Sequence, residues 1–127
     1  MTHSFRRIAV WIDQREAILA IFNGGNLSKE EEIRSHIEQE PHHHDWTRSH
    51  VQAYKHEHLK QYYAEIIEHL RPADEILLLG PGTAKQELHH QIDAHKGLKG
   101  KITAVKNSAK MDENELVTYA SHFFGLK

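Results

Sequence analysis

Histidines crowd one short stretch of this chain, and the imidazole ring is the side chain that proteins use most often to bind transition metals. The histidines of this stretch are His36, His42, His43, His44 and His50. A loop can gather three imidazoles around zinc, nickel or copper, so adventitious affinity for such an ion is predicted here, and no other cofactor is expected. Consecutive histidines point in different directions, however, which disfavours a preorganised site. The alternative is a solvated loop, or one that meets anionic RNA when its imidazoles are protonated.

A second candidate site is the glycine-rich turn Gly80-Pro-Gly, which joins a short apolar run to a predicted helix. Free N–H groups at a helix N-terminus bind anions, and Thr83 and Lys85 follow directly, so both are candidates for contact with a phosphate. The ending and the spacing of a Walker A loop are missing. The simpler interpretation is a tight turn and a helix cap, in which Gln86 completes a capping box with Thr83.

Basic residues are scattered, but several gather late in the chain, where they could form a patch for the phosphates of rRNA or tRNA with two arginines near the start. The candidates for RNA contact are Arg6, Arg7, Lys85, Lys96, Lys99, Lys101, Lys106 and Lys110. The formal net charge is −2 at pH 7, so the overall charge does not indicate a nucleic-acid-binding protein. A run of charge is most often a solvated face, and that alternative stays open.

Patterns of apolar residues predict the elements that must position these side chains. In chain order they are strands at 8–12, 17–22 and 27–37, an exposed loop at 38–51, a helix at 52–70, a strand at 76–79, a helix from 83, a strand at 102–105 and a closing helix after 112. The third strand is ambiguous, because its block of glutamates could begin a helix, yet apolar and polar residues alternate along it. The run at 17–22 is apolar throughout, as in a strand covered on both faces.

The order β-β-β-α-β-α-β-α defines the expected fold class, an α/β domain of ribonuclease-H-like arrangement. Three meandering strands and two right-handed crossover units form one mixed sheet with helices packed on it. This fold often holds acidic residues around two metal ions, so a nuclease or another hydrolase is one hypothesis. Asp13, near the end of the first strand, is the one acid in a suggestive place, and the fourth strand ends in Gly80 instead of a carboxylate. Asp13 is better explained as a turn residue, and no catalytic residue is assigned.

Length and composition limit the remaining possibilities. The 127 residues fit one domain, taken as 1–127, with an ordinary hydrophobic core. The absence of cysteine excludes a disulfide framework and thiolate chemistry, and it suits a reducing compartment. No apolar run approaches the roughly 20 residues of a membrane span, and the N-terminus lacks the apolar stretch of a signal peptide. A cytoplasmic location and no membrane partner are therefore expected.

Three segments carry a resemblance to a known family. They are the opening hairpin from Ala9 to Ile21, the strand, turn and helix start from Ile76 to Lys85, and the last strand and helix. They resemble the central domain of archaeal and eukaryotic class-1 release factors and of Pelota, over nearly the full chain. Bacterial proteins similar to this domain alone are described as translation-machinery proteins. The resemblance implies that the partner is the ribosome or its rRNA or tRNA, while the sequence leaves the oligomeric state open.

The resemblance also bears on activity. In release factors the segment between the third strand and the first long helix carries the tripeptide GGQ, which positions water for hydrolysis of peptidyl-tRNA. The corresponding segment here, 38–51, holds no GGQ, and Gly24-Gly-Asn lies in the preceding turn and ends in asparagine. Pelota also lacks GGQ and serves in the rescue of stalled ribosomes. The leading hypothesis is therefore a ribosome- or RNA-docking module without peptidyl-tRNA hydrolase activity; the alternatives are metal binding by the histidine loop and, third, a hydrolase.

Overall fold

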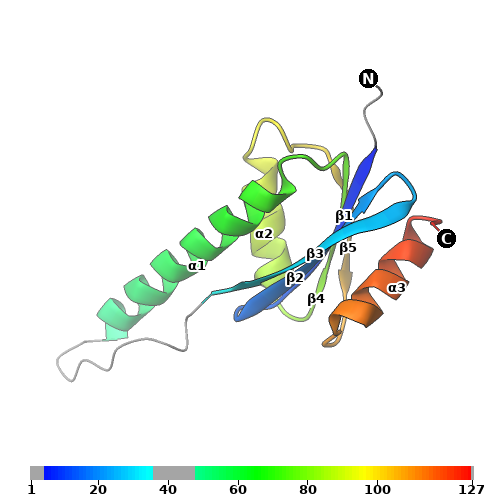
Figure 1. Cartoon of the computed structure of the whole chain (residues 1–127). Helices are drawn as coiled ribbons and strands as arrows, with labels where there is room; N and C mark the ends of the chain where they lie inside the picture. The colour runs from blue at the N-terminus through cyan, green and yellow to red at the C-terminus, as the bar shows by residue number, and fades with distance from the viewer. Residues whose placement is uncertain (1–4, 36–47, 127) are drawn as a thin grey trace.

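The computed structural model describes residues 5–35 and 48–126, with side chains from residue 51 onward in the second range. In these ranges five strands form one sheet, and three helices pack on it (Figure 1). The strands are β1 (Arg6–Ile12), β2 (Glu16–Asn23), β3 (Asn26–Arg34), β4 (Glu75–Gly80) and β5 (Ile102–Asn107). The helices are α1 (Arg48–Leu70), α2 (Ala84–Asp93) and α3 (Glu113–Phe123). The predicted order of elements is confirmed.

The sheet is mixed, and its strands lie in the order β3-β2-β1-β4-β5. The first three strands form an antiparallel meander, in which Val10 of β1 lies opposite Leu19 of β2. β1 is parallel to β4, where Val10 lies opposite Leu78, and β4 is parallel to β5. Helix α1 connects β3 to β4 and helix α2 connects β4 to β5. This arrangement is the ribonuclease-H-like class that the sequence predicts.

The sheet is covered on both faces, because side chains along a strand point alternately to opposite sides. Ile8, Val10 and Ile12 of β1 pack into the core beneath α1 and α2. Ala9 and Trp11 pack into a second core beneath α3. Figure 1 shows the two layers, with α1 and α2 on one side of the strands and α3 on the other. All five side chains are at most 1% exposed, so β1 is sealed from water on both sides.

Two predicted boundaries are wrong. Helix α1 begins at Arg48, so residues 48–51 are helical and do not belong to the exposed loop; no proline or glycine breaks the helix there. The third strand ends at Arg34 and does not include Ser35, and the predicted strand residues 36 and 37 lie outside the described residues. The first half of α1 extends away from the sheet (Figure 1). In the described parts of the chain, no helix is both long enough and apolar enough to cross a membrane.

The starts of α2 and α3 differ in how they are capped. At α3 the Asp112 carboxylate accepts a hydrogen bond from the Glu115 backbone N–H, and the Glu115 carboxylate accepts one from the Asp112 N–H, at 2.8 and 3.1 Å. At α2 the side chain of Thr83 makes no capping hydrogen bond, so the capping box predicted with Gln86 is wrong. A capping residue has an extended backbone, whereas Thr83 is already helical, with φ −102° and ψ −12°.

Gly80 ends β4 where the chain passes very close to β1. Its φ is +152°, and a Cβ placed at this residue would lie 2.1 Å from the backbone oxygen of Ile12. Both the backbone conformation and the lack of space exclude a side chain here. The Gly80 carbonyl also accepts a hydrogen bond from the Ser108 N–H at 3.1 Å. The close approach therefore joins the ends of β1, β4 and β5.

Replacement of Gly80 by alanine should lower the free energy of unfolding by roughly 2–4 kcal/mol, because the backbone of β1 must move to make room. Gly97→Ala is the matched control, since a Cβ at Gly97 meets nothing within 4 Å. The control should change the free energy of unfolding by less than about 0.5 kcal/mol. Urea unfolding followed by tryptophan fluorescence measures both variants. Equal midpoints would contradict the constraint inferred at Gly80.

Candidate nucleic-acid interface

The predicted RNA-binding cations fall at two opposite ends of the sheet. Because β1, β4 and β5 are parallel, their first residues lie at one end and their last residues at the other. Arg6 and Arg7 open β1, and Lys101 directly precedes β5. Lys106 is close to the end of β5, and Lys110 follows that strand. The predicted set is therefore not one patch but two separate surfaces.

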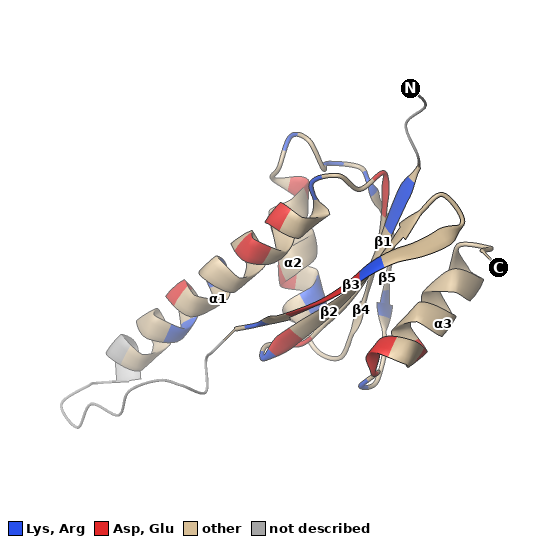
Figure 2. Cartoon of the chain, viewed as in Figure 1, with Lys and Arg blue, Asp and Glu red and all other residues tan. Residues whose placement is uncertain are grey.

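The end where the parallel strands begin carries a group of basic residues, the basic rim (Figure 2). The members of the basic rim are Arg6, Arg7, Arg71, Lys96, Lys99 and Lys101. Lys96 and Lys99 come from the loop between α2 and β5, and Arg71 follows the last residue of α1. Sequence reasoning missed Arg71. Its place between α1 and β4 was a usable signal, because a chain entering β4 must pass this end of the sheet.

Two arginines of the basic rim are paired with carboxylates. The Arg7 Nε lies 3.8 Å from a carboxylate oxygen of Glu75, and the Arg71 Nε lies 2.6 Å from one of Glu68. The Arg71 pair is exposed on both sides, with 60% and 61% of the two side chains accessible. Exposed pairs of this kind are weak and are screened by salt. Arg71 can therefore exchange its carboxylate for a phosphate at little cost, whereas the Arg7 side chain is only 24% accessible.

Lys96 and Lys99 supply the uncompensated charge of the basic rim. Both side chains are exposed, and neither has a carboxylate within 4.0 Å in the parts of the chain that are described. Lys101 differs, because its ammonium group donates a hydrogen bond to the Ala73 carbonyl at 3.1 Å and is half-buried. The loop between α2 and β5 thus presents two free ammonium groups to solvent.

An exposed aromatic ring adjoins Arg7 of the basic rim. Phe5 is 42% exposed, and the guanidinium carbon of Arg7 lies 4.7 Å from the centre of its ring. The Gly24 N–H donates to the Phe5 carbonyl at 2.9 Å, which ties the residue to the turn between β2 and β3. Proteins that bind single-stranded nucleic acid combine such basic grooves with aromatic rings on which bases stack. Phe5 was not among the residues predicted from sequence.

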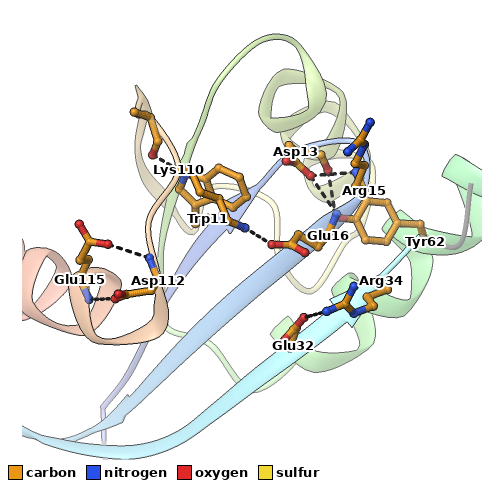
Figure 3. A network of polar contacts seen from close by, with 11 residues as sticks. Trp11, Asp13, Arg15, Glu16, Glu32, Arg34, Tyr62, Lys110, Asp112 and Glu115 are labelled. Carbon is orange, nitrogen blue, oxygen red and sulfur yellow. Dashed lines mark hydrogen bonds and ion pairs between the residues drawn. The ribbon is translucent and has the colours of Figure 1, made fainter. Parts of the chain in front are cut away.

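The cations at the opposite end of the sheet are held by contacts within the chain, and Figure 3 shows Lys110 near Trp11 and Glu16. Lys110 forms an ion pair with Glu16, and its Nζ lies 4.3 Å from the centre of the Trp11 ring. The Lys106 Nζ lies 5.5 Å from the centre of the Phe123 ring. A phosphate would have to compete with these cation–π contacts and with the ion pair. The two lysines are therefore weaker candidates for RNA contact than Lys96 and Lys99.

A groove of about 420 Å³ at this same end, between β3 and the start of α3, is acidic. Four carboxylates line it, against the one ammonium group of Lys110; they belong to Glu16, Glu32, Asp112 and Glu113. A hydrogen bond with Glu30 raises the pKa of the Glu113 carboxyl, and the nearby carboxylates of Glu30, Glu32 and Asp112 add to the effect. The neighbouring carboxylates make the potential around Glu113 negative. The groove is therefore less favourable for phosphates than the basic rim.

The glycine-rich turn does not present its lysine to solvent. Lys85 is only 3% exposed, and its Nζ donates a hydrogen bond to the Gly82 carbonyl at 2.6 Å. Thr83 is exposed on the other side of the turn. A phosphate contact through both residues, as predicted from sequence, would require Lys85 to leave this buried position. The geometry favours the simpler interpretation, in which the lysine closes its own turn.

Asp13 has the structural role that the sequence favours. Its Oδ1 accepts hydrogen bonds from the backbone N–H groups of Arg15 and Glu16, at 2.8 and 2.9 Å, and so closes the turn between β1 and β2 (Figure 3). The Tyr62 hydroxyl donates to the Asp13 carbonyl at 3.0 Å. Burial, and then the Asp13 carboxylate, raise the pKa of the Tyr62 phenol. The side chain of Asp13 is committed to backbone donors.

The structure describes only the backbone of one residue of the predicted histidine site. His36, His42, His43 and His44 lie outside the described residues, and His50 lies in α1 with its side chain not described. Among the described residues, no group of three or more histidine, aspartate and glutamate side chains could hold a metal ion. Metal binding by the histidine stretch therefore stays a prediction.

The fold and the distribution of charge define an α/β domain of the ribonuclease-H-like class with one basic end. The chain matches the family model described as bacterial archaeo-eukaryotic release factor family 10 over residues 3–113, and it belongs to this family. The family resemblance predicted from the sequence is confirmed. No curated protein matches the chain.

Solved structures share the fold. The Pelota protein of Thermoplasma acidophilum is 16% identical with a TM-score of 0.61, and the match covers 98% of this chain and 35% of that one. An archaeal translation termination factor is 18% identical with a TM-score of 0.55, over 87% and 32%. A Saccharomyces cerevisiae translation termination-like factor, involved in RNA quality control pathways, is 11% identical with a TM-score of 0.51, over 88% and 31%. The chain thus spans about a third of the length of each.

Alanine substitutions at Lys85 and at Lys99 should distinguish a structural lysine from an RNA-binding lysine. Lys85→Ala should lower the free energy of unfolding by about 1–3 kcal/mol, because a buried aliphatic stem loses its packing, and should leave RNA affinity unchanged at equal folded concentration. Lys99→Ala should weaken RNA binding and leave stability within about 0.5 kcal/mol. Urea unfolding and fluorescence anisotropy with a labelled RNA measure the two quantities. A loss of affinity in Lys85→Ala alone would reverse the two roles.

Proposed function

We propose that this chain is a translation-associated module that docks on the ribosome and contacts rRNA or tRNA through the basic rim. We also propose that it acts in the cytoplasm. The observation that supports this proposal most is the arrangement of free charge: exposed Lys96 and Lys99, without carboxylate partners in the described residues, share one end of the molecule with Phe5. The other end carries the acidic groove. A polyanion is therefore drawn to one end and repelled from the other.

The family gives this docking surface its context. The chain belongs to a release factor family, and the similar structures include a translation termination factor and a termination-like factor involved in RNA quality control. Those proteins are about three times as long, so their activities are not transferred as a whole.

We further propose that docking is not coupled to hydrolysis of peptidyl-tRNA. The segment 38–51 corresponds in position to the GGQ-bearing segment of release factors. It contains no glycine, and therefore no GGQ tripeptide. The turn at Gly24 does not replace this segment. The turn lies between β2 and β3, and the backbone N–H of Gly24 donates a hydrogen bond to the Phe5 carbonyl. The Oδ1 atom of Asp13 accepts hydrogen bonds from two backbone N–H groups, which supports its role as a turn residue. These observations support a binding role.

The physical basis of docking is contact between ammonium groups and phosphates. Each phosphate contact releases condensed counterions, so the binding constant falls as salt concentration rises, with a slope set by the number of contacts. Phe5 adds a surface on which an unpaired base can stack, and that contact is insensitive to salt. Affinity for the ribosome should therefore be strongly but not completely salt-dependent.

The test is sedimentation of the purified chain with purified ribosomes over a series of potassium chloride concentrations. Lys96→Glu combined with Lys99→Glu should weaken binding at least tenfold at about 0.1 M salt and reduce the salt slope by roughly 1.5–2, because two phosphate contacts are lost. The matched control is Lys29→Glu combined with Lys106→Glu, which changes the net charge equally at exposed positions outside the basic rim.

The control variant should bind like the original chain apart from a small uniform loss. If both double variants lose affinity equally, overall charge and not the basic rim governs binding. If the unaltered chain fails to sediment with ribosomes even at low salt, the proposed function is wrong.

A further inference from the structure

A groove of about 440 Å³ is lined by residues of α1 and α2. Figure 1 shows that these two helices lie on the face of the sheet away from α3. The volume of the groove falls within the range of pockets that hold small ligands. Leu59 and Tyr63, one helical turn apart on α1, form an apolar floor, and both pack against the core of this face. The Tyr63 hydroxyl donates to the Glu87 carboxylate of α2 at 2.5 Å. This bond joins the two helices and engages the Oε1 atom of Glu87, the one carboxylate that lines the groove.

The walls of the groove are polar and carry donors on both sides. His56 and Lys60 are four residues apart on α1, so both project from the same face of that helix. Gln86 and His90 have the same spacing on α2 and form the facing wall. All four side chains are exposed. Beside the Glu87 carboxylate, whose Oε1 is bonded to Tyr63, the groove offers a ligand one ammonium group, two imidazoles and the amides of Gln86 and Gln91.

We infer that this groove binds one unpaired nucleotide of an RNA strand, with the base over the apolar floor and the phosphate towards Lys60. A flat heteroaromatic base matches an apolar floor flanked by imidazole rings, since histidine is among the side chains on which unpaired bases stack. The Gln86 amide has both a donor and an acceptor, as the hydrogen-bonding edge of a base requires. Lys60 supplies the positive charge that the phosphate needs.

The groove and the basic rim lie along the same two helices. α1 runs from the groove to Arg71, eight residues beyond Tyr63, which corresponds to about 12 Å of helix. α2 ends shortly before Lys96. This length corresponds to about three or four stacked nucleotides, so one strand can place phosphates on the basic rim and a base in the groove. The assignment of the nucleotide to an RNA strand rests on the proposed function, whereas the nucleotide site itself does not.

The site can be tested without ribosomes by NMR titration of the full chain with AMP, GMP, CMP and UMP in turn, and with ribose 5-phosphate. At least one mononucleotide should shift the backbone amides of Leu59, Tyr63 and Glu87 with saturation below about 10 mM. Ribose 5-phosphate should bind at least tenfold more weakly, because it lacks the base. No saturable shift with any mononucleotide, or equal binding of ribose 5-phosphate, would overturn the inference.

Matched variants locate the site within the chain. Gln86→Ala combined with His90→Ala removes two exposed side chains of the α2 wall and should weaken the best mononucleotide at least tenfold. Gln61→Ala combined with His122→Ala removes the same residue types at exposed positions outside the groove and should leave its affinity unchanged. Equal affinities of the two double variants would place binding elsewhere.

A single-stranded RNA of eight nucleotides separates this inference from the proposed function. It should bind at least tenfold more tightly than the mononucleotide, and Lys96→Glu with Lys99→Glu should weaken the RNA but not the mononucleotide. If the RNA binds no more tightly than the mononucleotide, the docking role fails while the groove remains a site for free nucleotides. If the RNA binds through the basic rim and mononucleotides do not bind, the groove assignment fails alone.

Discussion

The burial of β1 and β4 on both faces is the constraint on which the rest of the structure depends. These two parallel strands lie at the centre of the sheet, and the side chains from Ile8 to Ile12 and from Ile76 to Leu79 are almost completely excluded from water. Strands of this kind are stable only if helices cover both faces. α1 and α2 must therefore lie on one face and α3 on the other, and the close contact at Gly80 ties the strands together where they end.

The same constraint decides where the molecule can meet a partner. Helices cover both faces of the sheet. Polar side chains can therefore contact a partner only at the two ends of the strands and in the groove between helices. At one end Lys110, Lys106 and Lys85 are engaged with side chains or carbonyl groups of the chain itself, beside an acidic groove. At the other end Lys96 and Lys99 remain available. A shared fold does not determine function, and the proposed docking role rests on this distribution of committed and free charge.

Sequence patterns predicted the architecture well, because strands buried on both faces consist of continuous runs of apolar residues. The fully apolar run at 17–22 is a strand buried on both faces, and the order of strands and helices followed from similar runs. The site was harder to predict, because charge in a sequence carries no information on tertiary partners. Lys85 looks like a surface cation and is buried, while Arg71 and the groove between α1 and α2 depend on which helices become neighbours. Thr83 matched the sequence pattern of a helix cap, but its backbone is already helical and its side chain makes no capping hydrogen bond.

The most direct test of the docking claim is photo-crosslinking of the full chain on ribosomes, with a photoreactive phenylalanine analogue at one exposed position. Position 97 lies between Lys96 and Lys99 in the basic rim, and position 109 lies beside Lys110 at the opposite end; both substitutions leave the cations intact. The account predicts crosslinks to ribosomal RNA from position 97 that disappear at high salt, and few from position 109. Crosslinks mainly from position 109, or to the same extent from both, would contradict docking through the basic rim.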